Sequence, residues 1–345
     1  MAYTTINKPT AYFDTRLYTG TGAENVVSDL GFNPDFVWFK KRSATEHHFL
    51  YDQVRGALKK IASSNQNAEA TETQTLKSFG SGGYTLGTSA EVNGSSVTYV
   101  AWNWKANGQG SANTDGSINT TYTSVNTTAG ISISKYTGTG ANGTVGHGLG
   151  VAPKMIMFKN LNTTTDWDVF FHDVGQGRRV HLNSSAAYNT STAYMNDTFP
   201  TSSVFSVGTA DNTNKASSPM VAYCFADVTG YQKIGSWTGN SSADGPIIYT
   251  GFKPAFIMSK NSNRNENWLI HDNKRGPINV NQTKLSPNDT STDSTNTAFA
   301  MDFLSNGFKI RTTDTALNQS GEVYAYLAIA EAPLVGSNNI PATAR

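Results

Sequence analysis

Hydrophobic and aromatic residues occur along this chain in short runs, separated by clusters of Gly, Asn, Ser and Thr. Apolar and polar residues alternate within some of these runs, as in residues 131–134 and 308–311. Short alternating runs are typical of β-strands, and the clusters between them are typical of turns. Only Gln53 to Ser63 has a pattern that allows a helix, and that helix would be short. The pattern therefore predicts an all-β protein.

The order of these elements repeats three times along the chain, which indicates three related units. In each unit a Gly-x-x-Pro element opens an apolar run that ends in a lysine, at Lys40, Lys159 and Lys260. An aspartate and a basic or glycine turn follow 12, 14 and 12 residues after the lysine. This structural repeat motif comprises Asp52, Arg55 and Gly56 in the first unit, Asp173 and Arg178 in the second, and Asp272, Arg275 and Gly276 in the third.

An aspartate at a strand end can accept backbone N–H groups of the following turn, and the arginine can pair with it. The motif therefore predicts a structural role. Units of this length fit domains with their own cores, so we predict three tandem homologous β-sandwiches, jelly-roll or lectin-like in outline. The predicted boundaries are an N-terminal arm at 1–16, sandwiches at 17–106, 135–228 and 229–332, a polar linker or hairpin insertion at 107–134, and a C-terminal arm at 333–345.

Charge and composition narrow the classes of partner. The 345 residues include 26 basic and 25 acidic ones, and charged residues make up only 15%. Because neutralising a phosphate backbone takes a basic patch, nucleic acid is not the expected partner. The densest basic cluster, Lys40 to Arg42, is interpreted as a solvated strand end. No apolar stretch is long enough to predict a membrane span or a secretion signal, so synthesis in a cytoplasm is expected.

The single cysteine, Cys224, excludes an intrachain disulfide and a cysteine-based zinc site. It lies in an apolar run, which predicts a buried, inert thiol. No histidine or carboxylate cluster has metal-ligand spacing, so neither a metal nor a cofactor is expected.

Two patterns could suggest catalysis. Gly138 to Gly143 matches the dinucleotide pattern G-x-G-x-x-G, but the glycine-rich residues after it cannot start a helix, so a β-turn is the better interpretation. The pairs His172-Asp173 and His271-Asp272 lie on strands, where neighbouring side chains point to opposite faces. They therefore cannot form a dyad directly, and we predict that the protein is not an enzyme.

Aromatic residues could bind sugars by stacking. Most of the tryptophans recur at matching repeat positions, which favours the core for them. Trp167, Tyr188 and Tyr194 are the better surface candidates, and we name them as candidate glycan contacts.

The first unit carries a resemblance to a known family. The strings Phe36 to Arg42, Tyr51 to Ala57, Gly83 to Gly87 and Tyr99 to Lys105 are similar to a domain of unknown function common in tailed phages of marine bacteria. The match is closest over residues 1–106, and the other two units look like diverged copies. The resemblance implies a virion protein, annotated in that family as tail fibre or tail-associated, and it supplies no catalytic residues.

We therefore expect a non-enzymatic structural protein of a bacteriophage virion that assembles through its terminal arms and β-sandwich surfaces. The alternatives are a module that binds a host surface glycan, a head fibre or capsid decoration protein, and a depolymerase. The expected partners are other virion proteins and further copies of the chain, for which a trimer is considered by analogy with such proteins.

Overall fold

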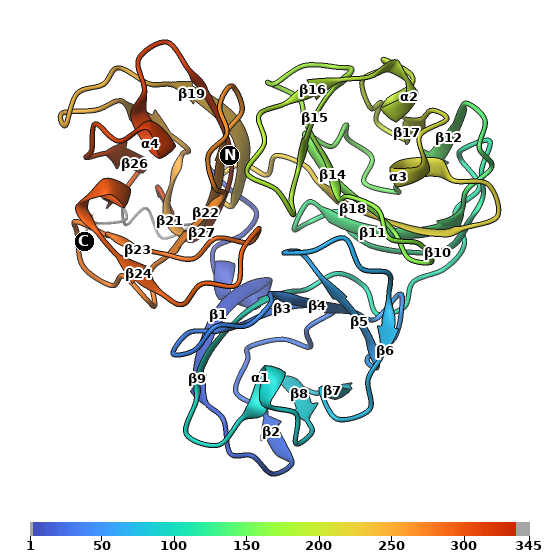
Figure 1. The fold of residues 1–345 in the computed structure, drawn as a ribbon, viewed down its shortest axis with the longest axis horizontal. Coiled ribbons are helices and arrows are strands. Elements are labelled where there is room, and N and C mark those ends of the chain that lie inside the picture. The colour runs from blue at the N-terminus through green and yellow to red at the C-terminus, as the bar shows by residue number, and fades with distance from the viewer. Residues whose placement is uncertain (1–2, 336–345) are drawn as a thin grey trace.

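The computed structural model describes residues 3–335. Its strands form antiparallel sheets and its helices are short, which confirms the predicted mostly-β class. Figure 1 shows three lobes around a common centre, which follow one another from the blue to the red end of the chain. We call residues 13–104 lobe one, residues 120–225 lobe two and residues 232–333 lobe three.

Lobe one has a larger and a smaller sheet. The larger sheet contains, in spatial order, β1 (Phe13–Thr19), β9 (Thr98–Trp104), β3 (Phe36–Lys41), β4 (Phe49–Asp52), β5 (Lys59–Ala62) and β6 (Ala70–Thr71). The smaller sheet contains β2 (Asn25–Val27), β8 (Gly83–Leu86) and β7 (Leu76–Gly80). The helical turns are η1 (Pro9–Ala11), just before the lobe, and α1 (Ala90–Asn93).

Lobe two repeats this arrangement with one added strand. Its larger sheet contains β10 (Thr120–Asn126), β11 (Ile131–Thr137), β18 (Pro219–Phe225), β13 (Met155–Asn160), β14 (Asp168–Phe171), β15 (Arg178–His181) and β16 (Asn189–Thr190). Its smaller sheet contains β12 (Gly143–Gly146) and β17 (Val204–Val207), and its helices are α2 (Thr192–Met195) and α3 (Asp211–Asn214).

Lobe three has the same central order. Its larger sheet contains β19 (Gln232–Thr238), β27 (Val323–Pro333), β21 (Phe252–Asn261) and β22 (Leu269–Asp272). Its smaller sheets contain β20 (Ile247–Tyr249), β26 (Gly307–Ile310) and β25 (Met301–Leu304), and the pair β23 (Thr283–Lys284) and β24 (Ser294–Thr295). Its helical turns are η2 (Thr297–Phe299) and α4 (Thr315–Asn318).

Strand register gives the residue correspondence between lobes without reference to residue type. Trp38 pairs with Trp102, Met157 with Tyr223, and Met258 with Leu327. On the next strand pair, Phe36 lies opposite Asp52, Met155 opposite Phe171, and Phe256 opposite Asp272. Because a one-residue slip would turn every side chain to the other face, these pairings fix which positions match.

A buried asparagine closes the same turn in each lobe. Asn93, Asn214 and Asn318 end the short helices α1, α3 and α4, and all three are fully buried. Their amides donate to matching carbonyls of Gly87, Gly208 and Thr312, each at 2.7 Å. Their side-chain oxygens accept the backbone N–H groups of Thr21, Thr139 and Asn240 in the Gly-rich turns. Buried polar groups need such partners, so these residues hold the turns in place.

The lobes share a core. Lobe one and lobe two each have a local cluster of buried apolar residues, but the largest cluster draws on all three lobes. Its members include Trp102 from lobe one, Tyr223 from lobe two and Trp268 from lobe three. The expectation of units that each have only their own core is therefore wrong, because the packing of one lobe is completed by its neighbours.

Three local predictions are corrected. Gln53–Ser63 is not helical, since it contains a turn and β5. Lys40 and Lys41 are buried, so this cluster is not a solvated strand end. The segment 107–134 contains β10 and the start of β11, which pair antiparallel, so the hairpin alternative describes it better than a linker does.

The predicted N-terminal arm is docked on its own chain. Thr4 donates its hydroxyl to the carbonyl of Thr229, and Ile6 is buried in the central cluster. Strand β1 already begins at Phe13. The predicted C-terminal arm, 333–345, lies outside the described residues from position 336 onward. Within the described part of the chain, no helix has the length and hydrophobicity to cross a membrane.

Candidate functional site at the centre of the three lobes

Two buried ion pairs lie where the lobes meet. Asp52 accepts the Nε–H of Arg55 at 2.6 Å and its backbone N–H at 2.8 Å. Asp272 binds Arg275 with the same two distances. None of the four side chains is exposed to solvent. The predicted aspartate–arginine pairing is thus confirmed in lobes one and three, and Gly56 takes the positive φ that the turn requires in lobe one. Gly276 follows Arg275 at the matching place and donates its N–H to the Asp272 carbonyl at 3.1 Å.

Each arginine is then held by a second acid and a carbonyl. The second acids, 3.1 Å from the guanidinium, are Glu69 in lobe one and Asp293 in lobe three. The carbonyls are those of Leu50 and Ile270. Burial by itself would lower the pKa of Arg55, but the carboxylate of Asp52 beside it raises that pKa above its ordinary value. The guanidinium therefore stays charged, as a buried Arg paired on several sides must.

Each ion pair also receives a donor from a neighbouring lobe. Tyr223 of lobe two donates its hydroxyl to Asp52 at 2.6 Å, and Trp102 of lobe one donates its indole N–H to Asp272 at 3.1 Å. Tyr223 and Trp102 occupy matching positions of β18 and β9. The same contact is therefore made twice around the ring of lobes.

Lobe two replaces the whole ion pair with apolar groups. The position that matches Asp52 is Phe171, and three residues later Val174 stands where the other lobes have arginine. Tyr188 matches the second acid, because Glu69, Tyr188 and Asp293 all donate their backbone N–H groups to corresponding carbonyls of a neighbouring lobe. Leu327 of lobe three matches the donors Trp102 and Tyr223. An apolar acceptor position thus accompanies an apolar donor position.

The motif predicted in lobe two is therefore misplaced. Asp173 lies two residues beyond the matching position and is exposed, where it binds His172 at 3.0 Å. Arg178 is exposed, donates to the Val174 carbonyl and stacks on Tyr188 at 4.5 Å. The spacing of 14 instead of 12 residues came from choosing an aspartate instead of counting positions.

Three matching lysines cross the lobe boundaries. Lys40, Lys159 and Lys260 are at most 1% exposed. Each ammonium binds a carbonyl in its own lobe and one in the neighbouring lobe. The neighbouring carbonyls are those of Thr290 at 3.1 Å, Gln66 at 3.0 Å and Ser185 at 3.1 Å. Burial lowers the pKa of Lys40 and of Lys159 to about 8, and that of Lys260 to about 7. The sequence showed these lysines as a recurring strand end, and that recurrence was the available signal for a structural role.

Two of the three candidate glycan contacts are not on the surface. Trp167 is fully buried and donates its indole N–H to the carbonyl of Ala62 in lobe one at 2.8 Å. The matching Trp268 donates to the carbonyl of His181 in lobe two. Tyr194 is also fully buried, while Tyr188 is half-buried under Arg178. The choice of Trp167 and Tyr194 as surface residues is wrong, because indole and phenol groups here complete interfaces and cores.

A model of one protein family matches residues 8–333, and its description is "Domain of unknown function (DUF7483)". The chain belongs to this family. Because the match runs through all three lobes, the DUF7483 unit is the complete three-lobed body and not one lobe. A comparison with curated proteins gives no match.

The histidine pairs of the DUF7483 chain have different surroundings. His271 is fully buried, with Nε2 2.9 Å from the Phe299 carbonyl. Burial, reinforced by Arg275, lowers its pKa to about 3, so the ring is neutral and donates that hydrogen bond. His172 is exposed and stacks against Phe199. Neither ring has a printed contact with a hydroxyl or thiol nucleophile.

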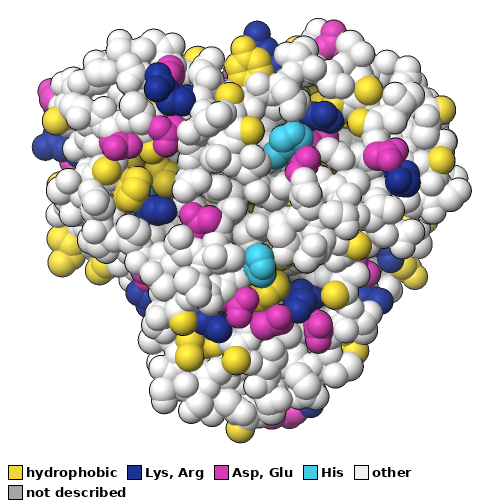
Figure 2. All heavy atoms as spheres, in the orientation of Figure 1, with side chains coloured by type: hydrophobic (Ala, Val, Ile, Leu, Met, Phe, Trp, Pro, Cys, Tyr) yellow, Lys and Arg dark blue, Asp and Glu magenta, His cyan; other side chains and the backbone are white. Residues whose placement is uncertain are grey.

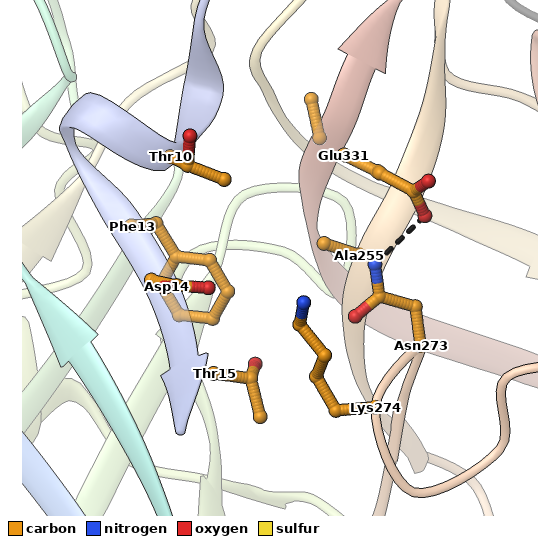
Figure 3. A pocket seen from close by; sticks show the side chains of 9 residues that line it. Thr10, Phe13, Asp14, Thr15, Ala255, Asn273, Lys274 and Glu331 are labelled. Atoms are coloured by element: carbon orange, nitrogen blue, oxygen red, sulfur yellow. Dashed lines mark hydrogen bonds between the residues drawn. The ribbon is translucent and has the colours of Figure 1, made fainter. Parts of the chain in front are cut away.

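The DUF7483 chain has a small polar hollow of about 100 Å³ between β1 and lobe three, which Figure 3 shows. Asp14 and Thr15 face it from one side, and Asn273 and Lys274 from the other. Burial raises the pKa of Asp14, and Lys274 acts in the opposite direction. The side-chain amide of Asn273 donates to Glu331 at 2.7 Å. The volume suits a few water molecules, and the lining groups pair with one another. Among residues 3–335, no group of three or more His, Cys, Asp or Glu side chains has a geometry for a metal ion.

Proposed function

We propose that this DUF7483 chain is a non-enzymatic structural protein of a bacteriophage particle, on the tail fibre or associated with the tail. The observation that supports this most is the interlocked centre: ion pairs, lysines and indoles that could form sites are used to hold three lobes in one body. A rigid body with satisfied buried polar groups suits a protein that must survive outside a cell.

The outer surface fits the same role. Figure 2 shows one face on which acidic and basic side chains are scattered among uncharged polar groups. A body of this kind can contact other particle proteins through shape and hydrogen bonds, without the basic field that nucleic acid would need. We propose further copies of the chain and other virion proteins as its partners.

We also propose that the lobes are copies of one ancestral β-sandwich unit, jelly-roll or lectin-like, with boundaries near 17–106, 135–228 and 229–332. The matching strand order, the three lysines and the three asparagines support common descent. The family match supports treating the three as one functional body.

Labelling of purified phage particles with antibodies against the purified chain tests the main proposal. Label on the tail is expected. Label on the head would favour the decoration alternative, and particles that contain the other virion proteins but bind no antibody would contradict both. Release of sugar fragments from host envelope by the purified chain would contradict the non-enzymatic assignment.

A glycan-binding role is a second proposal, which one observation favours at a new place. Tyr249 is 59% exposed and its hydroxyl lies 3.4 Å from that of Tyr3, beside a hollow of about 180 Å³. Exposed phenol rings beside polar groups can stack on sugars and bond to them. Adsorption of the purified chain to host cells that is lost in Tyr249→Ala and kept in Tyr194→Phe would support this role.

A further inference from the structure

The outer edges of the sheets differ between the lobes. In lobe two, edge strand β11 is covered by β10, which the chain itself supplies just before it. In lobes one and three, the matching strands β1 and β19 end their sheets without a further strand. The smaller sheets follow the same rule, because β2 and β20 also lie at sheet edges.

In lobe two the segment before β10 also covers the smaller sheet. Ile118 donates its backbone N–H to the Thr144 carbonyl of β12 at 2.9 Å. Ser117 and Thr144 exchange two further bonds, each from a backbone N–H to the other side chain at 2.9 Å. The Ile118 side chain is buried in the lobe-two core. An extended segment therefore fills the groove between the two sheet edges with main-chain bonds and one apolar anchor.

The matching groove of lobe one is open in the described part of the chain. Val27 lies opposite Tyr84 as Val145 lies opposite Phe205, so Val26 matches Thr144. A strand residue's N–H and C=O point to the same side, so the main chain of Val26 faces away from β8, as that of Thr144 faces Ile118. The Val26 side chain is 64% exposed, and a hollow of about 300 Å³ lies between β1 and β2.

Lobe three has its groove partly filled. Tyr3 donates its hydroxyl to the carbonyl of Gly251, just beyond β20, and Thr4 binds the carbonyl of Thr229 before β19. The chain therefore places one of its own extended segments at this groove in lobe two and another in lobe three. Lobe one is the lobe whose groove receives none from residues 3–335.

We propose that the β1–β2 groove of lobe one binds an extended, uncharged, Ser/Thr-rich segment of a partner polypeptide, in the way that residues 110–126 fill the groove of lobe two. Two observations select this occupant. The lobe-two segment shows the main-chain pattern that the groove accepts, which is strand addition. In lobe one, Arg16 and Asp29 pair with each other across the groove, so its charge is balanced and an uncharged strand fits it. The inference stands or falls independently of the particle assignment.

A synthetic peptide with the sequence of residues 110–126, labelled with a fluorophore, tests the proposal by anisotropy titration against the full chain. Saturable binding with one peptide per chain is expected. Val26→Pro removes the outward N–H without touching the bonds to β8, so it should fold normally and bind at least tenfold more weakly. Val26→Lys, which places a charge on the edge, is a second variant should the proline disturb folding.

Ile247→Pro is the matched control, because Ile247 occupies the same place on β20 and is 62% exposed. It should leave peptide binding unchanged. Absence of saturable binding, equal binding by the folded Val26 variants, or loss of binding in Ile247→Pro alone would overturn the proposal. A dimer that forms without peptide and disappears in Val26→Pro would also overturn it, because the edge would then pair with a second copy.

Discussion

The interface of lobe two differs from those of lobes one and three at four matched positions. Lobe one has Asp52, Arg55 and Glu69 with the donor Tyr223, and lobe three has an equivalent set. At these positions lobe two presents Phe171, Val174 and Tyr188, and the matching donor position is Leu327. A buried ion-pair network and an apolar cluster thus occupy the same place in one fold.

The comparison shows that such positions change as a set. A buried charge is costly unless it is paired and hydrogen-bonded, whereas well-packed apolar residues are often as stabilising. An intermediate with one partner removed would leave a charge without its partner. The side chains therefore match across the interfaces, where polar donors meet acids and the apolar position accompanies an apolar one.

A second matched exchange concerns volume. Lobe one has Trp38 on β3 and His48 before β4, whose Nδ1 accepts the indole N–H at 3.1 Å. Lobes two and three have methionine at the first position and tryptophan at the second, as in Met157 and Trp167. A large side chain moves from one strand to the next while the space filled stays similar, as dense packing requires.

The largest effect should come from placing a charge on the apolar side of this comparison. Phe171→Asp puts a carboxylate into a fully buried site with no arginine three residues later. We expect a loss of about 3–5 kcal/mol in the free energy of unfolding, because the charge is buried without a partner. Denaturant titration measures it, with Phe171→Leu as control at below about 1.5 kcal/mol. A loss for Phe171→Asp as small as that of the control would show that lobe two tolerates charge.

A smaller effect should follow from removing one donor on the charged side. Tyr223→Phe deletes the hydroxyl that Asp52 accepts, and we expect a loss of about 1–3 kcal/mol. Tyr194→Phe is the matched control. The Tyr194 hydroxyl is equally buried but has no hydrogen-bond partner among the described residues, so its removal should cost nothing. Equal losses in the two variants would mean that the bond to Asp52 contributes little.

Acid should affect the charged side through two histidines near the ion pairs. Burial, with Lys40 and Arg275 nearby, lowers the pKa of His48 well below its usual value, and that of His271 is lowered to about 3. The unfolded chain therefore binds more protons than the folded one between about pH 3 and 6.5. Stability is full above pH 6.5 and falls as the pH drops through this window.

The variant His48→Gln/His271→Gln should lose part of this acid sensitivity, since glutamine keeps a hydrogen-bonding group without titrating. Unfolding midpoints at pH 7, 6, 5 and 4 measure the effect as the difference between the two proteins, in which the contribution of carboxylates and of buried His147 cancels. Parallel pH profiles would contradict an origin in His48 and His271.

The sequence predicted much of the fold but only part of its centre. Strand runs, glycine turns and the threefold order follow from local patterns, and these were sufficient for the β class and for the Asp52–Arg55 pair. In lobe two the search followed residue type to Asp173, although counting 12 residues from Lys159 leads to Phe171. The bond from Tyr223 to Asp52 joins residues 171 positions apart and leaves no local pattern.

The smallest effect should come from converting the charged side into the apolar one as a whole. The variant Asp52→Phe/Arg55→Val/Glu69→Tyr/Tyr223→Leu gives lobe one the residues of lobe two. Because all members of the network leave together, no buried charge remains, and we expect stability within about 1 kcal/mol of the parent, or above it. Arg55→Val alone, which leaves Asp52 with its tyrosine but without its cation, should lose about 3–5 kcal/mol. The difference between the two is a double-mutant-cycle measure of coupling that denaturant titration provides. If the fourfold variant loses as much as the single one, the matched positions are not interchangeable, and the ion pairs would then have a role in fixing the fold that apolar packing cannot replace.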